Sequence, residues 1–274
     1  MISAAHLAAR LGDADLRVVD ATWFLPPSPT TGRESYRQAH IPGAVFFDID
    51  AIADAASGLP HMLPSPEEFA RAAGGLGLSR EAEIVVYDAQ GIFSAPRVWW
   101  TLKVMGYPRV RVLDGGLKAW MAAGFPLEGG EAAPAPAKVV PMFAGGVRDL
   151  RQVQAVLADG SAQVVDARPA ARFRGEAPEP RPGLRSGHMP GARSLPWSTL
   201  VREDGTLRSE GELQEAFTAA GVDVAAPVVA TCGSGVSAAV VALALARLGQ
   251  DAALYDGSWS EWGASADTDV VTGP

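Results

Sequence analysis

Short motifs from the first half of this 274-residue chain recur, in the same order, in its second half. The four matched pairs are Val18–Ala21 with Val164–Ala167, His40–Ala44 with His188–Ala192, Ile84–Asp88 with Val228–Cys232, and Asp114–Trp120 with Asp256–Trp262. The spacing within the pairs changes by only a few residues, so the halves differ mainly in loop length. Such a repeat predicts two copies of one folding unit in tandem, and the chain length also favours two domains.

Within each half, short β-branched runs alternate with stretches rich in alanine and leucine. The runs predict strands over residues 16–20, 84–87, 110–113, 163–166, 228–231 and 252–255, and the stretches predict helices over residues 4–11, 66–74, 96–105, 149–158, 210–220 and 237–248. Apolar strands separated by helices are typical of a parallel sheet covered on both faces. The predicted fold class is therefore α/β, with two tandem domains, each a parallel sheet with helices on both faces.

The domain boundaries follow from a composition change in the middle of the chain. Residues 128–146 are rich in Gly, Ala and Pro, which is typical of an extended linker. We expect an N-terminal domain over residues 1–127, this linker, and a C-terminal domain over residues 147–274.

Charge and cysteine usage limit the possible partners and compartments. The net charge of −8 argues against general nucleic-acid binding. No apolar stretch is long enough to span a bilayer, and the N-terminus lacks the apolar core of a signal peptide, so we expect neither membrane insertion nor export. A single cysteine forms no intramolecular disulfide, which fits the reducing cytoplasm. The histidines stand apart from one another without cysteine pairs, so we expect no metal site and no cofactor.

That single cysteine, Cys232, lies where a predicted strand passes into a predicted helix. The loop residues after it, Gly233, Ser234, Gly235, Val236 and Ser237, can curl so that their backbone N–H groups point inward as an anion cradle. A helix N-terminus and unpaired N–H donors both favour the thiolate form of a cysteine. We therefore interpret Cys232 as a nucleophile. Its counterpart in the first half is Asp88, so we expect the N-terminal domain to be non-catalytic.

Arginine is concentrated in one part of the second half. Six of the 20 arginines fall between residues 168 and 193, and such a cluster gives an acidic protein a local site for an anionic substrate. The planar fork of an arginine suits a carboxylate. His40 and His188 occupy matched places, which indicates a structural role in a turn feeding a short strand.

The chemistry of the loop favours sulfur transfer over phosphate hydrolysis. A cysteine phosphatase needs an arginine six residues after its cysteine, and this chain has Ala238 there. The six-residue loop Cys232-Gly233-Ser234-Gly235-Val236-Ser237 resembles that of the 3-mercaptopyruvate sulfurtransferases, in the two-domain rhodanese superfamily. Residues 61–64, 94–100 and 166–181 resemble the same family, and the likeness covers nearly the whole chain. Thiosulfate-using rhodaneses typically have basic residues directly after the cysteine, whereas Gly233 and Ser234 are neutral.

The resemblance implies that Cys232 accepts sulfur from 3-mercaptopyruvate as a persulfide, releases pyruvate, and passes the sulfur to cyanide, a thiol or thioredoxin. It further implies that Arg172 and Arg181 bind the carboxylate and keto group of the donor. We expect a serine hydroxyl, with Ser234 as the candidate, or water to protonate the pyruvate enolate. The family can carry an acid–histidine–serine relay, for which Glu34, His40 and Ser234 are the possible counterparts, although the segment before His40 is shortened. Two alternatives stay open: a thiosulfate sulfurtransferase, and a non-catalytic persulfide carrier or regulatory module.

Overall fold

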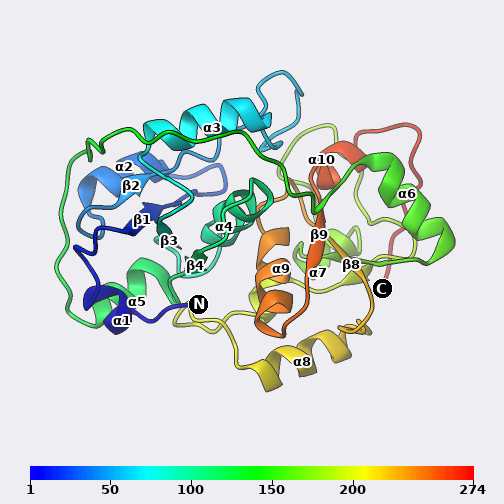
Figure 1. The fold of residues 1–274 in the computed structure, drawn as a ribbon. Helices are drawn as coiled ribbons and strands as arrows, with labels where there is room; N and C mark the ends of the chain where they lie inside the picture. The colour runs from blue at the N-terminus through cyan, green and yellow to red at the C-terminus, as the bar shows by residue number, and fades with distance from the viewer. The chain divides into compact units, whose positions relative to one another are not determined.

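The computed structural model describes residues 1–274, and the chain divides into two compact units (Figure 1). Unit 1 comprises Met1–Ala55, Leu63–Gly145 and Glu203–Leu207, and unit 2 comprises Ala56–Met62, Gly146–Arg202 and Arg208–Pro274. Each unit therefore takes one short segment from the opposite half of the sequence. The domain boundaries predicted from the sequence, on either side of residues 128–146, did not include these two exchanged segments.

Unit 1 is built on a parallel sheet with the strand order β2-β1-β3-β4. Its strands are β1 (Leu16–Asp20), β2 (Val45–Phe46), β3 (Glu83–Tyr87) and β4 (Val110–Val112). Every residue of β3 is buried, as expected for a central strand of a sheet covered on both faces. Its helices are α1 (Ala4–Ala8), α2 (Gly32–Gln38), α3 (Pro66–Gly75), α4 (Ala95–Val104) and α5 (Gly116–Ala122).

Unit 2 repeats this plan with one additional edge strand, in the order β5-β9-β8-β6-β7, and all its pairings are parallel. Its strands are β5 (Val147–Arg148), β6 (Gln163–Asp166), β7 (Arg193–Ser194), β8 (Val228–Thr231) and β9 (Ala252–Tyr255). Its helices are α6 (Leu150–Asp159), α7 (Ala170–Phe173), α8 (Glu210–Ala219), α9 (Ala238–Arg247) and α10 (Ser258–Trp262), with one 3-10 turn, η1 (Trp197–Thr199).

Local sequence fixes where several of these helices begin. Helices α2, α3, α6 and α8 each begin with a capping box, in which the side chains of the N-cap residue and of the third helical residue each accept from the other's backbone N–H. The residue pairs are Thr31 and Glu34, Ser65 and Glu68, Asp149 and Gln152, and Ser209 and Glu212. α9 has no such cap, because its N-cap Ser237 makes no side-chain hydrogen bond. That helix is instead fixed by burial, since every residue from Ala238 to Leu245 is buried.

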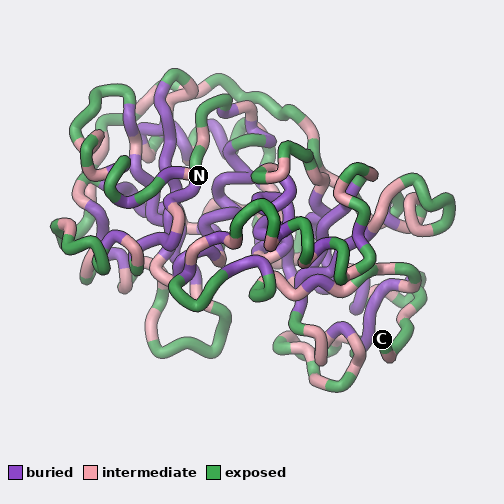
Figure 2. Tube along the Cα trace, turned by 90° about the horizontal axis from the view of Figure 1, so that it is seen from below, coloured by how far each residue is buried: buried purple, intermediate pink, exposed green.

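Each unit has its own apolar core, which Figure 2 shows as the buried tube segments. Trp120 is fully buried in the core of unit 1, and its counterpart Trp262 is 3% exposed in that of unit 2. The repeated tryptophans are therefore core residues. None of the helices has the length and apolar composition needed to cross a bilayer.

The fold class predicted from the sequence is confirmed: two parallel-sheet α/β domains follow one another. The six predicted strands occur with bounds within one residue of those expected. The short strands expected after the turns at His40 and His188 are β2 and β7, whereas β5 and the short helices α2, α5, α7 and α10 were not predicted. Residues 129–146 contain no helix or strand.

Candidate active site

Cys232 directly follows β8, the central strand of unit 2, and precedes α9 by five residues. The side chain is 2% exposed. The backbone N–H groups of Gly233, Ser234, Val236 and Ser237 have no hydrogen-bond partner in the chain. Gly235 has a φ of +77°, a conformation that glycine adopts without strain. The loop is thus a short arc of amide donors at the carboxyl end of a parallel sheet, where ligands of such folds gather.

The first turn of α10 holds the opposite side of this loop. The backbone N–H of Trp259 donates to the Cys232 carbonyl, and that of Ser260 donates to the Gly233 carbonyl, each at 2.9 Å. The Ser260 hydroxyl donates to the same Gly233 oxygen at 2.6 Å. Because α10 binds these two carbonyl groups, the adjoining peptide N–H groups are directed away from it. Sequence reasoning missed this contribution, since α10 follows another strand.

The matched loop of unit 1 is filled by its own carboxylate. Asp88 is fully buried, and its Oδ2 accepts from the backbone N–H groups of Phe93, Ser94 and Ala95 at 2.8 to 2.9 Å. Its Oδ1 accepts from Gln90 N–H at 2.8 Å. A loop of this design therefore binds one anionic group through four amides. This arrangement supports the expectation that a matching anion cradle surrounds Cys232.

Two arginines approach the loop at the residue after the cysteine. A Cβ built on Gly233 would lie 3.2 Å from Nη2 of Arg172 and 4.0 Å from Nη1 of Arg181. Both guanidinium groups therefore lie over Gly233, where a larger residue would crowd Arg172. The structure brings together Cys232, Arg172 and Arg181 as the sequence predicted.

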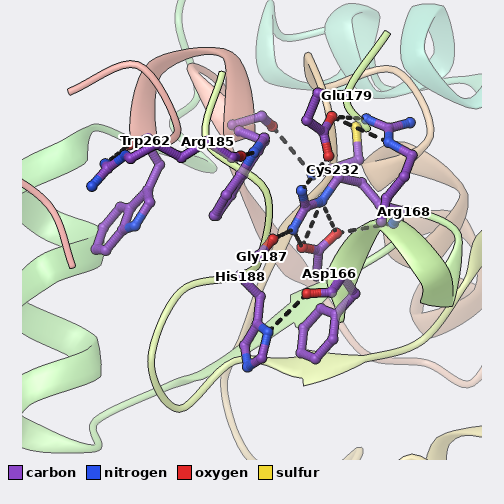
Figure 3. A network of polar contacts seen from close by, with 12 residues as sticks. Asp166, Arg168, Glu179, Arg185, Gly187, His188, Cys232 and Trp262 are labelled. Carbon is purple, nitrogen blue, oxygen red and sulfur yellow. Dashed lines mark hydrogen bonds and ion pairs between the residues drawn. The ribbon is translucent and has the colours of Figure 1, made fainter. Parts of the chain in front are cut away.

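A buried chain of alternating charges, formed by Asp166, Arg168 and Glu179, lies beside Cys232 (Figure 3) and continues to Arg172. Arg168 contacts Asp166 at 2.6 Å and Glu179 at 2.8 Å, and all three side chains are 1% exposed. Glu179 in turn accepts from Arg172. Burial alone lowers the pKa of Arg168, but the two carboxylates outweigh it and raise that pKa, so Arg168 stays charged. Sequence reasoning did not single out Glu179.

Ser234 has a histidine partner that sequence reasoning did not assign. His61 Nδ1 lies 3.0 Å from the Ser234 hydroxyl oxygen and 3.3 Å from the Ser234 carbonyl oxygen. His61 is 6% exposed and has a φ of +62°, which non-glycine residues seldom adopt. It lies in the segment Ala56–Met62, which belongs to unit 2 although it lies in the first half of the sequence. The one signal was that residues 61–64 resemble the family.

The expected relay through Glu34 and His40 is not formed, because both side chains are already engaged within unit 1. His40 Nδ1 lies 2.7 Å from the Tyr36 carbonyl oxygen, and its Nε2 lies 3.2 Å from Glu128. The Glu34 carboxylate closes the capping box of α2. His188 likewise lies 2.9 Å from the Phe173 carbonyl oxygen. The two repeated histidines therefore share a structural role, and His61 is the histidine at Ser234.

Unit 1 contains an open cavity of about 520 Å³ at the carboxyl ends of β1 and β2. Its one arginine, Arg33, is paired with Asp48 and Glu131, and no cysteine or histidine lines it. No group of three or more His, Cys, Asp or Glu side chains is placed to hold a metal ion. The groups suited to covalent chemistry therefore gather around Cys232.

Comparison with known proteins supports this assignment. Residues 3–123 and 149–265 each match the rhodanese-like domain family. The chain is 45% identical to the 3-mercaptopyruvate sulfurtransferase of Escherichia coli K12 over 272 residues, covering 98% of this chain and 96% of that one. It is 42% identical to the thiosulfate sulfurtransferase of Gallus gallus over 265 residues, covering 95% and 90%. The crystal structure of SseA from E. coli, a 3-mercaptopyruvate sulfurtransferase, superposes with a TM-score of 0.88 at 42% identity, covering 94% of this chain and 98% of that one.

Proposed function

Because the chain belongs to the rhodanese-like family, with two copies of its domain, we propose that it is a sulfurtransferase that takes sulfur from 3-mercaptopyruvate. The observation that carries this proposal is the approach of two guanidinium groups to Gly233, beside the single cysteine. A planar carboxylate fits such a pair, since each arginine offers two parallel N–H donors. The carboxylate and keto group of the donor bind Arg172 and Arg181, which places its sulfur near Cys232.

In the first half-reaction, the Cys232 thiolate attacks the sulfur of the donor. A sulfur–sulfur bond forms and the carbon–sulfur bond breaks, so that its electron pair leaves on the enolate of pyruvate. The enolate takes a proton from the Ser234 hydroxyl and is released as pyruvate, and the serine oxygen regains a proton from solvent by way of His61, whose Nδ1 lies 3.0 Å away. The donor's own thiol hydrogen stays on the outer sulfur of the persulfide.

In the second half-reaction, an external thiophile attacks the outer sulfur and regenerates the Cys232 thiolate. This is covalent catalysis by double displacement. When the outer sulfur loses its hydrogen to solvent, the amides of Gly233, Ser234, Val236 and Ser237 stabilise the negative charge on the persulfide. Cyanide and small thiols are acceptors, and we extend the proposal to reduced thioredoxin. A thiolate nucleophile needs a reducing compartment, so we place the reaction in the cytoplasm.

One observation keeps thiosulfate as a second donor, namely the relative named thiosulfate sulfurtransferase at 42% identity. Thiosulfate is a compact dianion that gains from positive charge directly beside the thiolate. Gly233 and Ser234 provide none, and the arginines are set for a planar carboxylate instead. A purely non-catalytic carrier has no use for such a pair. The first consideration favours 3-mercaptopyruvate over thiosulfate as donor, and the second favours an enzyme over a carrier.

A donor comparison with the purified protein tests the proposal. We expect a higher kcat/KM for 3-mercaptopyruvate than for thiosulfate, parallel double-reciprocal lines, and a mass gain of one sulfur atom on Cys232 with donor alone. Cys232→Ser abolishes turnover and the mass gain. A preference for thiosulfate, or activity that survives Cys232→Ser, contradicts the proposal.

The role of Arg172 has its own test. Arg172→Ala removes a carboxylate contact, so it raises KM for 3-mercaptopyruvate far more than KM for thiosulfate. Arg174→Ala is the matched control, because Arg174 is exposed and pairs only with Glu176. Equal losses with both donors count against carboxylate binding by Arg172.

A further inference from the structure

We propose that Glu179 is a positioning residue that sets the donor preference by holding Arg172 in one orientation. This inference rests on the proposed function, in which Arg172 binds the donor carboxylate. Glu179 is separated from Cys232 in sequence by β7, η1, α8 and β8, and none of its atoms needs to touch the donor.

The contacts divide the Arg172 guanidinium into two edges. Glu179 Oε2 accepts from Nε of Arg172 at 3.1 Å and from Nη2 of the same guanidinium. An arginine has five N–H donors, so Glu179 uses the edge formed by Nε and Nη2. The edge formed by Nη1 and Nη2 remains for a second carboxylate. The same Nη2 lies above Gly233, so that second edge is at the Cys232 loop.

Glu179 is itself fixed from behind, so it can serve as a rigid support. Its other oxygen, Oε1, accepts from Nη1 of Arg168 at 2.8 Å. Arg168 is held by Asp166 and by the Gly187 carbonyl at 2.8 Å. Its guanidinium also stacks 4.0 Å over the Trp259 ring. Figure 3 shows this network converging beside Cys232. Each group has little freedom to turn, so the orientation of Arg172 is set before a donor arrives.

The sign of the charge on Glu179 explains why this support affects donor choice. Asp166, Arg168, Glu179 and Arg172 alternate in sign, and their formal charges cancel. A donor carboxylate bound to the Nη1–Nη2 edge of Arg172 adds the next negative charge to this alternating series. Thiosulfate carries two negative charges and has no planar carboxylate to use that edge. Glu179 therefore favours an oriented monocarboxylate and disfavours a compact dianion.

The test is the kinetics of Glu179→Gln with both donors. This variant keeps the shape of the side chain and leaves Arg168 paired with Asp166. Because a charged hydrogen bond that fixes Arg172 is lost, we expect KM for 3-mercaptopyruvate to rise about tenfold with kcat nearly unchanged, while kcat/KM for thiosulfate stays level or rises. Glu176→Gln is the matched control, since Glu176 lies in the same segment and pairs only with the exposed Arg174; its donor ratio should equal that of the unaltered protein.

A double-mutant cycle separates positioning from a general structural role. In an Arg172→Ala background, Glu179→Gln should cause no further change in KM for 3-mercaptopyruvate, because its effect passes through Arg172. Glu179→Asp keeps the charge but moves it back by one methylene, so we expect a KM for 3-mercaptopyruvate between those of the unaltered protein and Glu179→Gln. This variant replaces Glu179→Gln in the test if circular dichroism shows that Glu179→Gln does not fold. An unchanged KM in Glu179→Gln, equal losses with both donors, or additive losses in the double variant overturns the inference. A preference of the unaltered protein for thiosulfate instead contradicts the proposed function itself.

Discussion

Strand β1 of unit 1 and strand β6 of unit 2 each end in a buried aspartate, Asp20 and Asp166. The two aspartates have different partners. Asp166 pairs with Arg168, whereas Asp20 accepts from the Thr22 N–H at 2.8 Å and is repelled by the Asp88 carboxylate. Burial raises the pKa of Asp20 from 3.8 to about 6, against the hydrogen bonds from Thr22 that lower it. Equivalent residues of a repeat thus differ in electrostatics because a single neighbour differs.

This shift predicts how stability changes with pH. Between about pH 4 and pH 6 the folded chain keeps a proton on Asp20 that the unfolded chain has lost, so stability falls as pH rises through this range and levels off above it. Unit 1 should therefore be about 1.4 kcal/mol more stable at pH 5 than at pH 7.5 on account of this group. Urea denaturation of the unaltered protein and Asp20→Asn measures it. An equal pH dependence in both proteins contradicts the prediction.

His61 is placed to assist proton transfer at Ser234, because its Nδ1 lies 3.0 Å from the Ser234 hydroxyl oxygen. The enolate of pyruvate needs a proton, whereas the sulfite that leaves thiosulfate does not. His61→Ala should therefore lower kcat with 3-mercaptopyruvate by about 100-fold while the thiosulfate rate changes little. His40→Gln is the control: it removes a buried histidine of unit 1 and should lower stability without altering the donor ratio. Similar losses with both donors after His61→Ala would exclude a proton-transfer role.

At the scale of elements, the two strand-to-helix loops show how one backbone design serves two purposes. The loop of unit 1 binds its own carboxylate, Asp88, through four amides. The loop of unit 2 has a thiol at that place, and the amides of Gly233, Ser234, Val236 and Ser237 have no hydrogen-bond partner in the chain. The repeat and the strand-to-helix pattern were enough to predict the loop at Cys232 and the strands before both loops, but not that Asp88 fills the loop of unit 1.

Removal of the Asp88 carboxylate should loosen the loop in front of α4. The four amides lose a charged acceptor, which costs about 3 kcal/mol. In Asp88→Ala, the amides of Phe93, Ser94 and Ala95 should then exchange hydrogen about 100-fold faster. Hydrogen exchange read by mass spectrometry on this segment measures the change. Asp15→Ala, at an exposed carboxylate, is the control, and unchanged exchange in Asp88→Ala contradicts the interpretation.

Other elements could not be predicted, for physical reasons. β5 has two residues and α7 has four, too few to show a period in the sequence. They form because tertiary contacts fix them. His61 lies in a turn without periodic pattern, and only the folding of Ala56–Met62 with unit 2 brings it to Ser234. Glu179 was equally hidden, because a buried carboxylate and an exposed one look alike in sequence.

At the scale of the whole molecule, one cysteine serves the entire chain. A persulfide on Cys232 therefore has no second thiol in the chain to attack it, and only an external acceptor can remove the sulfur. After donor is added and removed, the protein should retain one sulfur per chain until a dithiol is supplied. Intact mass measured over time checks this. Loss of the sulfur without an acceptor, or a second sulfur on the chain, contradicts it.

The missing side chain at Gly233 has an evolutionary consequence. Any residue with a Cβ there meets Nη2 of Arg172 at 3.2 Å, so a larger residue at this position requires the Arg172 guanidinium to shift by a few tenths of an ångström. Substitution at position 233 is thus coupled to Arg172, because a side chain added there takes space that the guanidinium occupies. Evolution at this position is therefore epistatic with evolution at Arg172.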